Sequence, residues 1–455
     1  MKWTEIYSDR RSDRDNRADS ARSEYQIDFD RLIFSSGFRR LQNKTQVFPL
    51  PGSTFVHNRL THSLEVASVG RSLGKIVGTR IAEIGEGFSE EDTAFYTYEL
   101  ANVVAAACLA HDIGNPAFGH SGEKAISNYF IEFESNLIER VKLREYFSEP
   151  EWSDLIHFEG NANALRILTH QFNGKHPGGL FLTYSTLAAI LKYPCESVAM
   201  TKGLKHRKKY GFFQTEKDTF LRICRSLNMI EESADPISFR RHPFVYLTEA
   251  ADDICYRVID LEDAQRLGIL PARDVEEYLL NLTRELGEDV DKIQNTLGRI
   301  SDRNERIGYL RARSISSLIN QSVSIFMDNK EAILAGEYND TLLDSLQENC
   351  PALQAIQDIS IEKIYNHETV VEIEIAGYHV MSDLLEMMIP AALKSNPGHK
   401  DEKILRLLPG QFRFGPEASP YEKALSILDF VSGMTDEYAT EMYRKIFGIE
   451  IPKHR

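Results

Sequence analysis

The sequence predicts a mainly α-helical protein with a helical core and a C-terminal helical extension, and at most a minor β element. Three observations support this fold class. Apolar residues recur at helical spacing through most of the 455 residues, only residues 370–375 have the pattern of a strand, and no Gly/Ser linker or internal repeat divides the chain. We therefore expect a charged N-terminal arm at 1–27, a core at 28–270 and a helical region packed on that core at 271–455.

The composition is that of an ordinary soluble globular protein. Its net charge of -15 argues against non-specific nucleic-acid binding as the main task, because phosphate backbones repel an acidic surface. The five scattered cysteines form no C-x-x-C pair, which fits a reducing cytoplasm and gives neither a disulfide framework nor a zinc knuckle. We find no signal peptide and no stretch long enough to span a bilayer, so we expect a cytoplasmic protein without a membrane partner.

The N-terminal third alternates helical patterns with turns. Residues 1–23 are charged and are expected to be extended or mobile, and residues 28–46 combine apolar residues at helical spacing with arginines. A turn-rich connection at 47–52 precedes a long amphipathic pattern that continues to Ile81. After a break at 85–93, residues 94–113 form an almost wholly apolar helix, which we expect to be buried on every side.

The rest of the chain is expected to be helical, with short loops between the helices. Before the strand candidate, the expected helices lie at 123–143, from about 155 to 170, before 192–194, and at about 248–263, 273–289 and 303–328; after it, they lie at 376–394 and 419–447.

The stretch from Cys108 to Glu123 carries the most chemistry. His111 and Asp112 end the apolar helix, and an imidazole and a carboxylate leaving a dry core are costly unless something pairs with them. A divalent metal ion would pair with both. His120 and Glu123 follow at helical spacing and supply an acid–base candidate with a carboxylate to orient it.

Four groups could form one metal site: His62, His111, Asp112 and one aspartate of the pair Asp252–Asp253. Imidazole and carboxylate ligands suit a catalytic divalent ion whose open positions take water or phosphate oxygen. Alternatively, His62 caps a helix and His111–Asp112 is a satisfied polar pair. That alternative is stronger for each residue alone, whereas the four together favour the metal.

The sequence also resembles a known superfamily. His62, the His111–Asp112 doublet and a distant aspartate form the pattern of the HD superfamily of metal-dependent phosphohydrolases. More specific segments, in order along the chain, resemble the deoxyguanosine triphosphate triphosphohydrolases (dGTPases). They are F-R-R-L-Q-N-K-T-Q-V-F-P-L (38–50), R-L-T-H-S-L-E-V (59–66), H-D-I-G-N-P-A-F-G-H-S-G-E (111–123), H-F-E-G-N-A (157–162), E-A-A-D-D-I-C-Y-R-V-I-D-L-E-D (249–263) and G-M-T-D-E-Y-A (433–439).

This resemblance implies an HD-domain core and hydrolysis of deoxynucleoside triphosphates (dNTPs), either dGTP or several, to deoxynucleoside and tripolyphosphate. It implies a divalent metal ion, Mn²⁺, Mg²⁺ or Co²⁺, or Ni²⁺ or Zn²⁺ as found. It also implies a homo-oligomer, with a hexamer favoured. The sequence does not reveal base specificity, the physiological metal, or whether a second dNTP or single-stranded DNA activates the enzyme.

The resemblance further implies that His62, His111, Asp112 and Asp252 are the metal ligands. Asp252 is favoured over Asp253 because the family motif places a tyrosine four residues after the ligand and an aspartate four residues after that. Helical geometry puts residues four apart on one stripe, although geometry alone does not exclude Asp253.

The same resemblance assigns roles around the substrate. His120 and Glu123 form the catalytic pair, and Gln46, Tyr256 and Asp260 read the deoxyribose. The triphosphate clamp comprises Arg59, Asn161, Lys192, Tyr193 and Lys209. Without the resemblance, Tyr256 would be read as a core aromatic, His120 as a bystander at a helix N-terminus, and the basic run 202–209 as a solvated loop.

Other functions remain open. The chain could be another HD phosphohydrolase, such as a 5′-deoxynucleotidase, a cyclic-nucleotide phosphodiesterase or a guanosine polyphosphate hydrolase. The clamp residues argue against a monophosphatase. A catalytically silent nucleotide-sensing protein and an interaction scaffold are further alternatives, and the complete set of ligands with His120 and Glu123 weighs against the silent protein.

Overall fold

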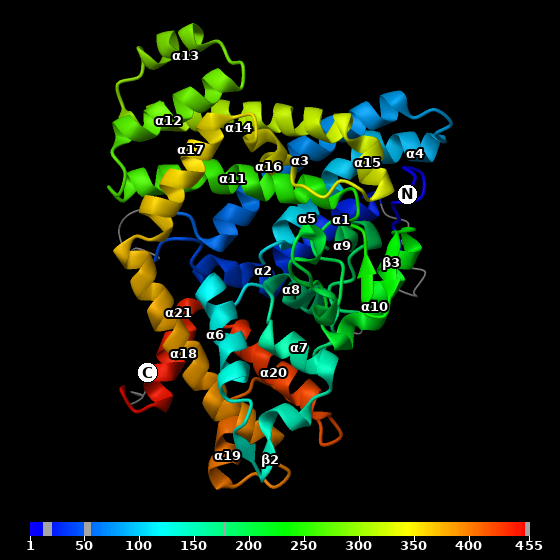
Figure 1. Cartoon of the computed structure of the whole chain (residues 1–455), viewed down its shortest axis with the longest axis vertical. Coiled ribbons are helices and arrows are strands. Elements are labelled where there is room, and N and C mark those ends of the chain that lie inside the picture. The colour runs from blue at the N-terminus through cyan, green and yellow to red at the C-terminus, as the bar shows by residue number, and fades with distance from the viewer. Residues whose placement is uncertain (12–20, 50–55, 176–177, 451–455) are drawn as a thin grey trace.

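The computed structural model describes residues 1–11, 21–49, 56–175 and 178–450. The described chain is mainly helical, which confirms the expected fold class (Figure 1). Its β structure consists of two antiparallel ribbons. They pair β1 (Leu137–Ile138) with β2 (Val141–Lys142), and β3 (Glu231–Ala234) with β4 (Ile237–Phe239). Residues 12–20 of the expected arm and the end of the expected connection at 47–52 lie outside the described residues.

The helices have the following bounds. The first ten are α1 (Glu24–Phe34), α2 (Ser36–Arg40), α3 (Arg59–Ile84), α4 (Glu90–Ala94), α5 (Leu100–Ala110), α6 (Gly119–Glu132), α7 (Glu149–Ile156), α8 (Gly160–Thr169), α9 (Tyr184–Ala188) and α10 (Lys217–Ser226). The others are α11 (Val245–Arg266), α12 (Ala272–Glu285), α13 (Val290–Leu297), α14 (Arg303–Asp328), α15 (Lys330–Ala335), α16 (Leu342–Gln347), α17 (Pro351–Ile359), α18 (Glu368–Leu393), α19 (His399–Leu405), α20 (Pro420–Ser432) and α21 (Asp436–Ile446).

Helix α5 is the centre of the larger hydrophobic core. Residues 103–110 have no exposed surface, as the apolar run predicts, and α3, α1 and α11 pack around them. Helices α3 and α5 approach closely because α3 has glycines at the contact. A Cβ on Gly74 would lie 3.0 Å from the Ala101 Cα, and one on Gly70 would lie 2.4 Å from the Cys108 Sγ. This close contact brings the N-terminal turn of α3 beside the C-terminal end of α5.

A second hydrophobic core forms around α6, α7 and α18–α21. The C-terminal region divides between the two cores. Helices α12, α14, α16 and α17 join the larger one, whereas α18 leads away from α17 and packs along α6 and α20 (Figure 1). The ends of α5 and α6 therefore meet where the two cores adjoin.

Some expectations about individual elements are wrong or need adjustment. Residues 370–375 are not a strand but belong to α18, and the helix expected at 419–447 is two helices, α20 and α21, separated at Gly433. The described part of the N-terminal arm packs on the core, because Ile6 is fully buried and Tyr7 stacks on Phe95 with 3.9 Å between ring centroids. Within the described ranges, no helix is long and apolar enough to cross a membrane.

Candidate active site and metal centre

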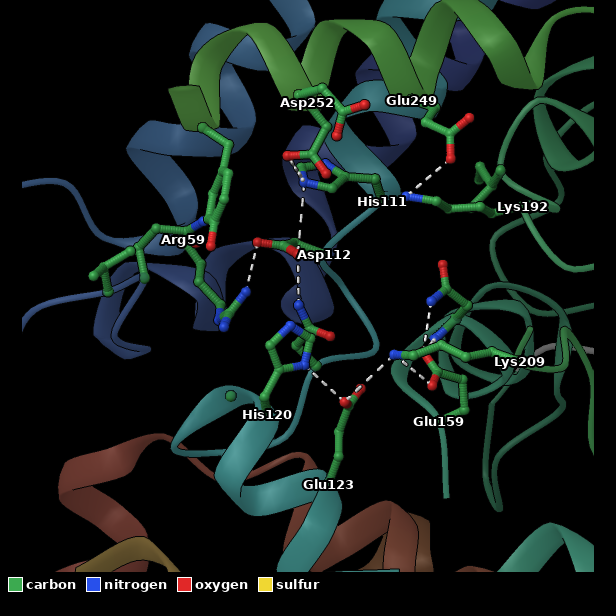
Figure 2. Close-up of a pocket in the computed structure, with 18 of the residues that line it drawn as sticks. Arg59, His111, Asp112, His120, Glu123, Glu159, Lys192, Lys209, Glu249 and Asp252 are labelled. Carbon is green, nitrogen blue, oxygen red and sulfur yellow. Dashed lines mark hydrogen bonds and ion pairs between the residues drawn. The ribbon is translucent and has the colours of Figure 1, made fainter. Parts of the chain in front are cut away.

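The predicted site residues meet at a cavity of about 580 Å³ between α11 and α6 (Figure 2). Asp252 and Glu249 come from α11 on one side, and His120 and Glu123 come from α6 on the opposite side. All the predicted site residues line this cavity except His62 and Asp260, which lie just behind its wall. Residues separated by more than two hundred positions in the sequence therefore share one pocket.

Three separate elements supply the predicted metal ligands. His62 lies in the first turn of α3, which is fixed by a capping box between Asn58 and Thr61. His111 and Asp112 follow the last residue of α5, and Asp252 projects from α11. Ligand atoms of His62, His111 and Asp112 all lie within 4.8 Å of one another. The Asp252 Oδ1 lies 3.0 Å from the His62 Nε2 and 3.5 Å from the His111 Nε2.

His111 shows that these residues fit a bound cation. Its Nδ1–H donates to the Cys108 carbonyl at 2.6 Å, and its Nε2 lies 3.5 Å from a carboxylate oxygen of Asp112 and of Asp252. That Nε2 is buried and has no hydrogen-bond partner among the described residues. Burial lowers the pKa of His111, but Asp112 and Asp252 outweigh burial and raise it to about 9. The local potential therefore favours positive charge, as a divalent ion requires.

Asp112 is held by two donors. The Arg59 Nη1 donates to its Oδ2 at 2.7 Å, and the Asn115 Nδ2 donates to its Oδ1 at 2.5 Å. Burial raises the pKa of Asp112, but the charges of Arg59, His111 and His62 outweigh burial and hold it below its usual value. Asp112 is thus an ionised, oriented carboxylate.

His120 and Glu123 form the pair that the sequence predicts. The His120 Nδ1–H donates to the Glu123 Oε2 at 2.9 Å, and the His120 side chain lines the cavity and is 75% exposed. The Gly160 N–H donates to the other Glu123 oxygen at 2.8 Å. Burial raises the pKa of Glu123, but the His120 hydrogen bond and the Lys209 charge outweigh it, so the pKa is lowered. An ionised Glu123 fixes the ring and leaves its Nε2 directed away from the pair.

Each predicted clamp cation already has a carboxylate partner. Lys192 lies 3.2 Å from Glu249, and Lys209 lies 2.7 Å from Glu159, which also accepts the Asn161 amide at 2.6 Å. Arg59 pairs with Asp112 as described above. Both lysines therefore lie on the same side of the cavity with their charges balanced, and Arg59 lies on the other side of Asp112 (Figure 2).

Gln46 and Tyr256, two of the residues assigned to the sugar, line the cavity together with Tyr365. Tyr256 stacks on Tyr365 with 5.3 Å between centroids, and the Tyr365 hydroxyl donates to Asp260 at 2.8 Å. Asp260 thus lies behind Tyr365, off the cavity wall, and burial raises its pKa to about 8. The Gln46 Oε1 is buried at the wall with no hydrogen-bond partner among the described residues, so it is available to a hydroxyl.

Asp436 in α21 ties two loops of the site together. Its Oδ2 accepts the Thr45 N–H at 2.8 Å, and its Oδ1 accepts the Phe118 N–H at 2.9 Å. Thr45 precedes Gln46, and Phe118, with a left-handed φ of 61°, precedes the first turn of α6. The C-terminal region therefore positions the site from outside the predicted core.

Sequence reasoning gave no role to Asn115, Glu159, Glu249, Tyr365 or Asp436. All but Tyr365 lie inside motifs that resemble the family, so a signal was present for these four. Tyr365 lies outside the motifs that resemble the family, and only the folded structure brings it into contact with Asp260. Of the two adjacent aspartates, Asp252 contacts both histidines, whereas Asp253 lies nearer Lys192.

Comparison with known proteins shows the family of the chain. A family model described as HD domain matches residues 59–193, and one described as phosphohydrolase-associated domain matches residues 346–445. A deoxyguanosinetriphosphate triphosphohydrolase-like protein of Pseudomonas aeruginosa is 41% identical over 95% of both chains, and one of Synechocystis is 36% identical over 99% of this chain and 100% of the relative. The deoxyguanosinetriphosphate triphosphohydrolase of Yersinia enterocolitica is 32% identical, over 95% of this chain and 96% of its own. The chain is therefore a hydrolase built on an HD domain and belongs to the deoxyguanosinetriphosphate triphosphohydrolase family.

Proposed function

We propose that this protein hydrolyses deoxynucleoside triphosphates to deoxynucleoside and tripolyphosphate, and that it requires a divalent metal ion such as Mn²⁺, Mg²⁺ or Co²⁺. One observation carries the proposal. A single cavity combines the His–Asp cluster, the His120–Glu123 pair, a row of cationic groups and a tyrosine-lined end. A substrate with a sugar bonded to a triphosphate needs all four features: a place for the sugar, a metal at the α-phosphate, a proton-transfer group and cations for the phosphates.

The reaction is the attack of water on the α-phosphorus. A new P–O bond forms, the bond from the α-phosphorus to the 5′-oxygen breaks, and the water's protons end on the nucleoside hydroxyl and in solvent. A divalent ion bound by His62, His111, Asp112 and Asp252 would supply Lewis acidity at the α-phosphate and lower the pKa of nearby water. His120 transfers a proton at the reacting oxygens through its exposed Nε2, and Glu123 keeps the ring oriented.

The clamp binds the triphosphate by exchanging partners. Lys192 and Lys209 turn from Glu249 and Glu159 toward phosphate oxygens, to which ammonium groups make charge-assisted hydrogen bonds. Because the cations are already held along the wall, little ordering is left for the bound state. The α-phosphate is thereby brought to the metal end of the cavity.

The tyrosine-lined end selects deoxyribose. Tyr256, supported from behind by Tyr365, packs against the C2′ side of the sugar, and Gln46 accepts from the 3′-hydroxyl. A ribose would bury its 2′-hydroxyl against a ring without a partner, which costs roughly 1–3 kcal/mol. Deoxynucleotides should therefore be preferred about 5- to 150-fold.

The test is chromatographic product analysis with the four dNTPs, singly and mixed, with Mn²⁺ and with Mg²⁺. We expect deoxynucleoside and tripolyphosphate as products, with ribonucleotides and deoxynucleoside monophosphates as poor substrates. A monophosphate with pyrophosphate would contradict the assigned geometry, and preferential cleavage of deoxynucleoside monophosphates would favour a 5′-deoxynucleotidase instead. Lack of turnover with every metal would favour the nucleotide-sensing alternative.

A further inference from the structure

A second cavity, of about 280 Å³, lies behind the active site and shares none of its predicted residues. Its wall combines an apolar part with cationic side chains. Ile113 and Ile167 line one part, and the rings of Phe172 and Phe412 meet edge to face with 5.7 Å between centroids. Three cations also line the cavity: Lys44 is buried, Arg40 is half-buried and Lys175 is exposed.

Lys44 is a buried cation without an anionic partner. The residue is 3% exposed. Its ammonium group donates to the Asn115 carbonyl at 2.6 Å and to the Ser432 carbonyl at 2.9 Å. These two bonds leave the third N–H of the ammonium group without an assigned acceptor. Among the described residues no carboxylate lies within ion-pair distance, and Asp436, which influences Lys44 from further away, is engaged by two backbone N–H groups.

Arg40 also has no carboxylate partner among the described residues. Its one hydrogen bond within the described chain is a long one, 3.4 Å from the Nη1 to the Gly433 carbonyl. The acidic residue on the cavity wall, Asp429, is engaged by both sides of the Arg166 guanidinium at 2.8 Å. Desolvating two cations without a counter-charge is costly, and burial lowers the pKa of Lys44 to about 7. An anion in the cavity would remove this cost.

Lys44 also connects the two cavities. The Asn115 carbonyl accepts from Lys44, while the Asn115 side chain lines the active-site cavity and donates to the predicted metal ligand Asp112. A group that fixes Lys44 therefore also fixes the residue that orients Asp112.

We propose that this second cavity binds a small organic anion with a planar apolar group, whose phosphate or carboxylate end accepts hydrogen bonds from Lys44 and Arg40. The planar part lies against the rings of Phe172 and Phe412. The bound anion completes the hydrogen bonds of Lys44 and so restrains Asn115 beside the active site. This site is independent of the reaction proposed above.

Titration calorimetry on the full chain with phenyl phosphate tests the proposal. We expect saturable binding to the wild type that weakens at least roughly tenfold in both Lys44→Met and Arg40→Gln. Arg40 is only half-buried, so its variant keeps the test valid if Lys44→Met fails to fold. Lys192→Met removes an active-site cation, and Lys142→Met is an exposed control; both should retain the affinity.

The reverse pattern, with affinity lost in Lys192→Met and kept in Lys44→Met, would put the anion in the active-site cavity and overturn the proposal, as would the absence of saturable binding. Benzoate and inorganic phosphate separate the possible ligands. If benzoate bound more tightly than phenyl phosphate, the natural ligand would carry a carboxylate. If inorganic phosphate bound as tightly as phenyl phosphate, the apolar contact would be refuted. Neutral phenol should not bind. Hydrogen exchange of residues 111–117 should slow with ligand in the wild type only; unchanged exchange would refute the link to Asn115.

Discussion

Asp436 allows a quantitative test of how the C-terminal region supports the site. Replacing it with alanine removes the only carboxylate that the structure assigns to the Thr45 and Phe118 N–H groups. Each buried backbone donor left without a partner costs about 1–3 kcal/mol, so Asp436→Ala should lower the free energy of unfolding by roughly 2–6 kcal/mol. Asp436→Asn keeps one acceptor and should lose about half as much.

Catalysis should decline with stability, because the two donors flank Gln46 and His120. The assay pairs denaturant unfolding with kcat/KM for dNTP hydrolysis at a temperature where every variant is folded. Glu437→Ala is the matched control. It removes an exposed carboxylate from the same helical turn, and it should change the unfolding free energy by no more than about 0.5 kcal/mol. If Asp436→Ala behaved like this control, the two hydrogen bonds would not support the site and the reasoning would fail.

Three further predictions concern the metal, the catalytic pair and pH. His111→Ala should lose bound metal and turnover, whereas His120→Ala should keep its metal, measured by mass spectrometry, and lose about 10²–10⁴-fold in kcat; equal metal loss in both would contradict the assigned roles. Gly160→Ala should impair turnover and stability by about 1–3 kcal/mol, because its Cβ would lie 2.3 Å from the Asn115 Oδ1 and 2.7 Å from the Glu123 Oε1; wild-type kinetics and stability would show that neither close approach matters. Burial lowers the pKa of His57, but hydrogen bonds to Asp263 and Glu65 outweigh burial and raise this pKa to about 10. The protonated His57 therefore stabilises the fold fully below about pH 6.5, and this stabilisation is lost as the pH rises to 10. The unfolding free energy should fall by up to about 1.4 kcal/mol per pH unit in this window, and the His57→Gln variant should show a smaller slope; an unchanged slope would exclude His57 as the source.

Local patterns were sufficient for elements whose environment is uniform. The apolar run at 103–110 predicted a helix buried on all sides, and α14 has the expected bounds of 303–328. Residues 370–375 misled because their alternation fits a short strand as well as one face of a helix. In α18, Val370, Ile373 and Glu374 share the face that lines the active-site cavity, while Val371 and Ile375 are exposed four residues apart.

The site was predictable where motifs carry chemistry, and less so where long-range contacts position it. His111 and Asp112 could be identified because a polar pair at the end of an apolar helix needs a partner. The stacking of Tyr365 on Tyr256 depends on how residues far apart in the chain fold together, and no spacing reveals it. For the same reason the sequence could not show that Asp260 is covered by Tyr365.

Hydrolysis of a dNTP in H₂¹⁸O, followed by mass spectrometry of both products, tests the proposed chemistry most directly. Attack of water on the α-phosphorus predicts one ¹⁸O atom in the tripolyphosphate and an unlabelled deoxynucleoside. Label in the deoxynucleoside 5′-hydroxyl, or release of a labelled monophosphate with pyrophosphate, would contradict the account.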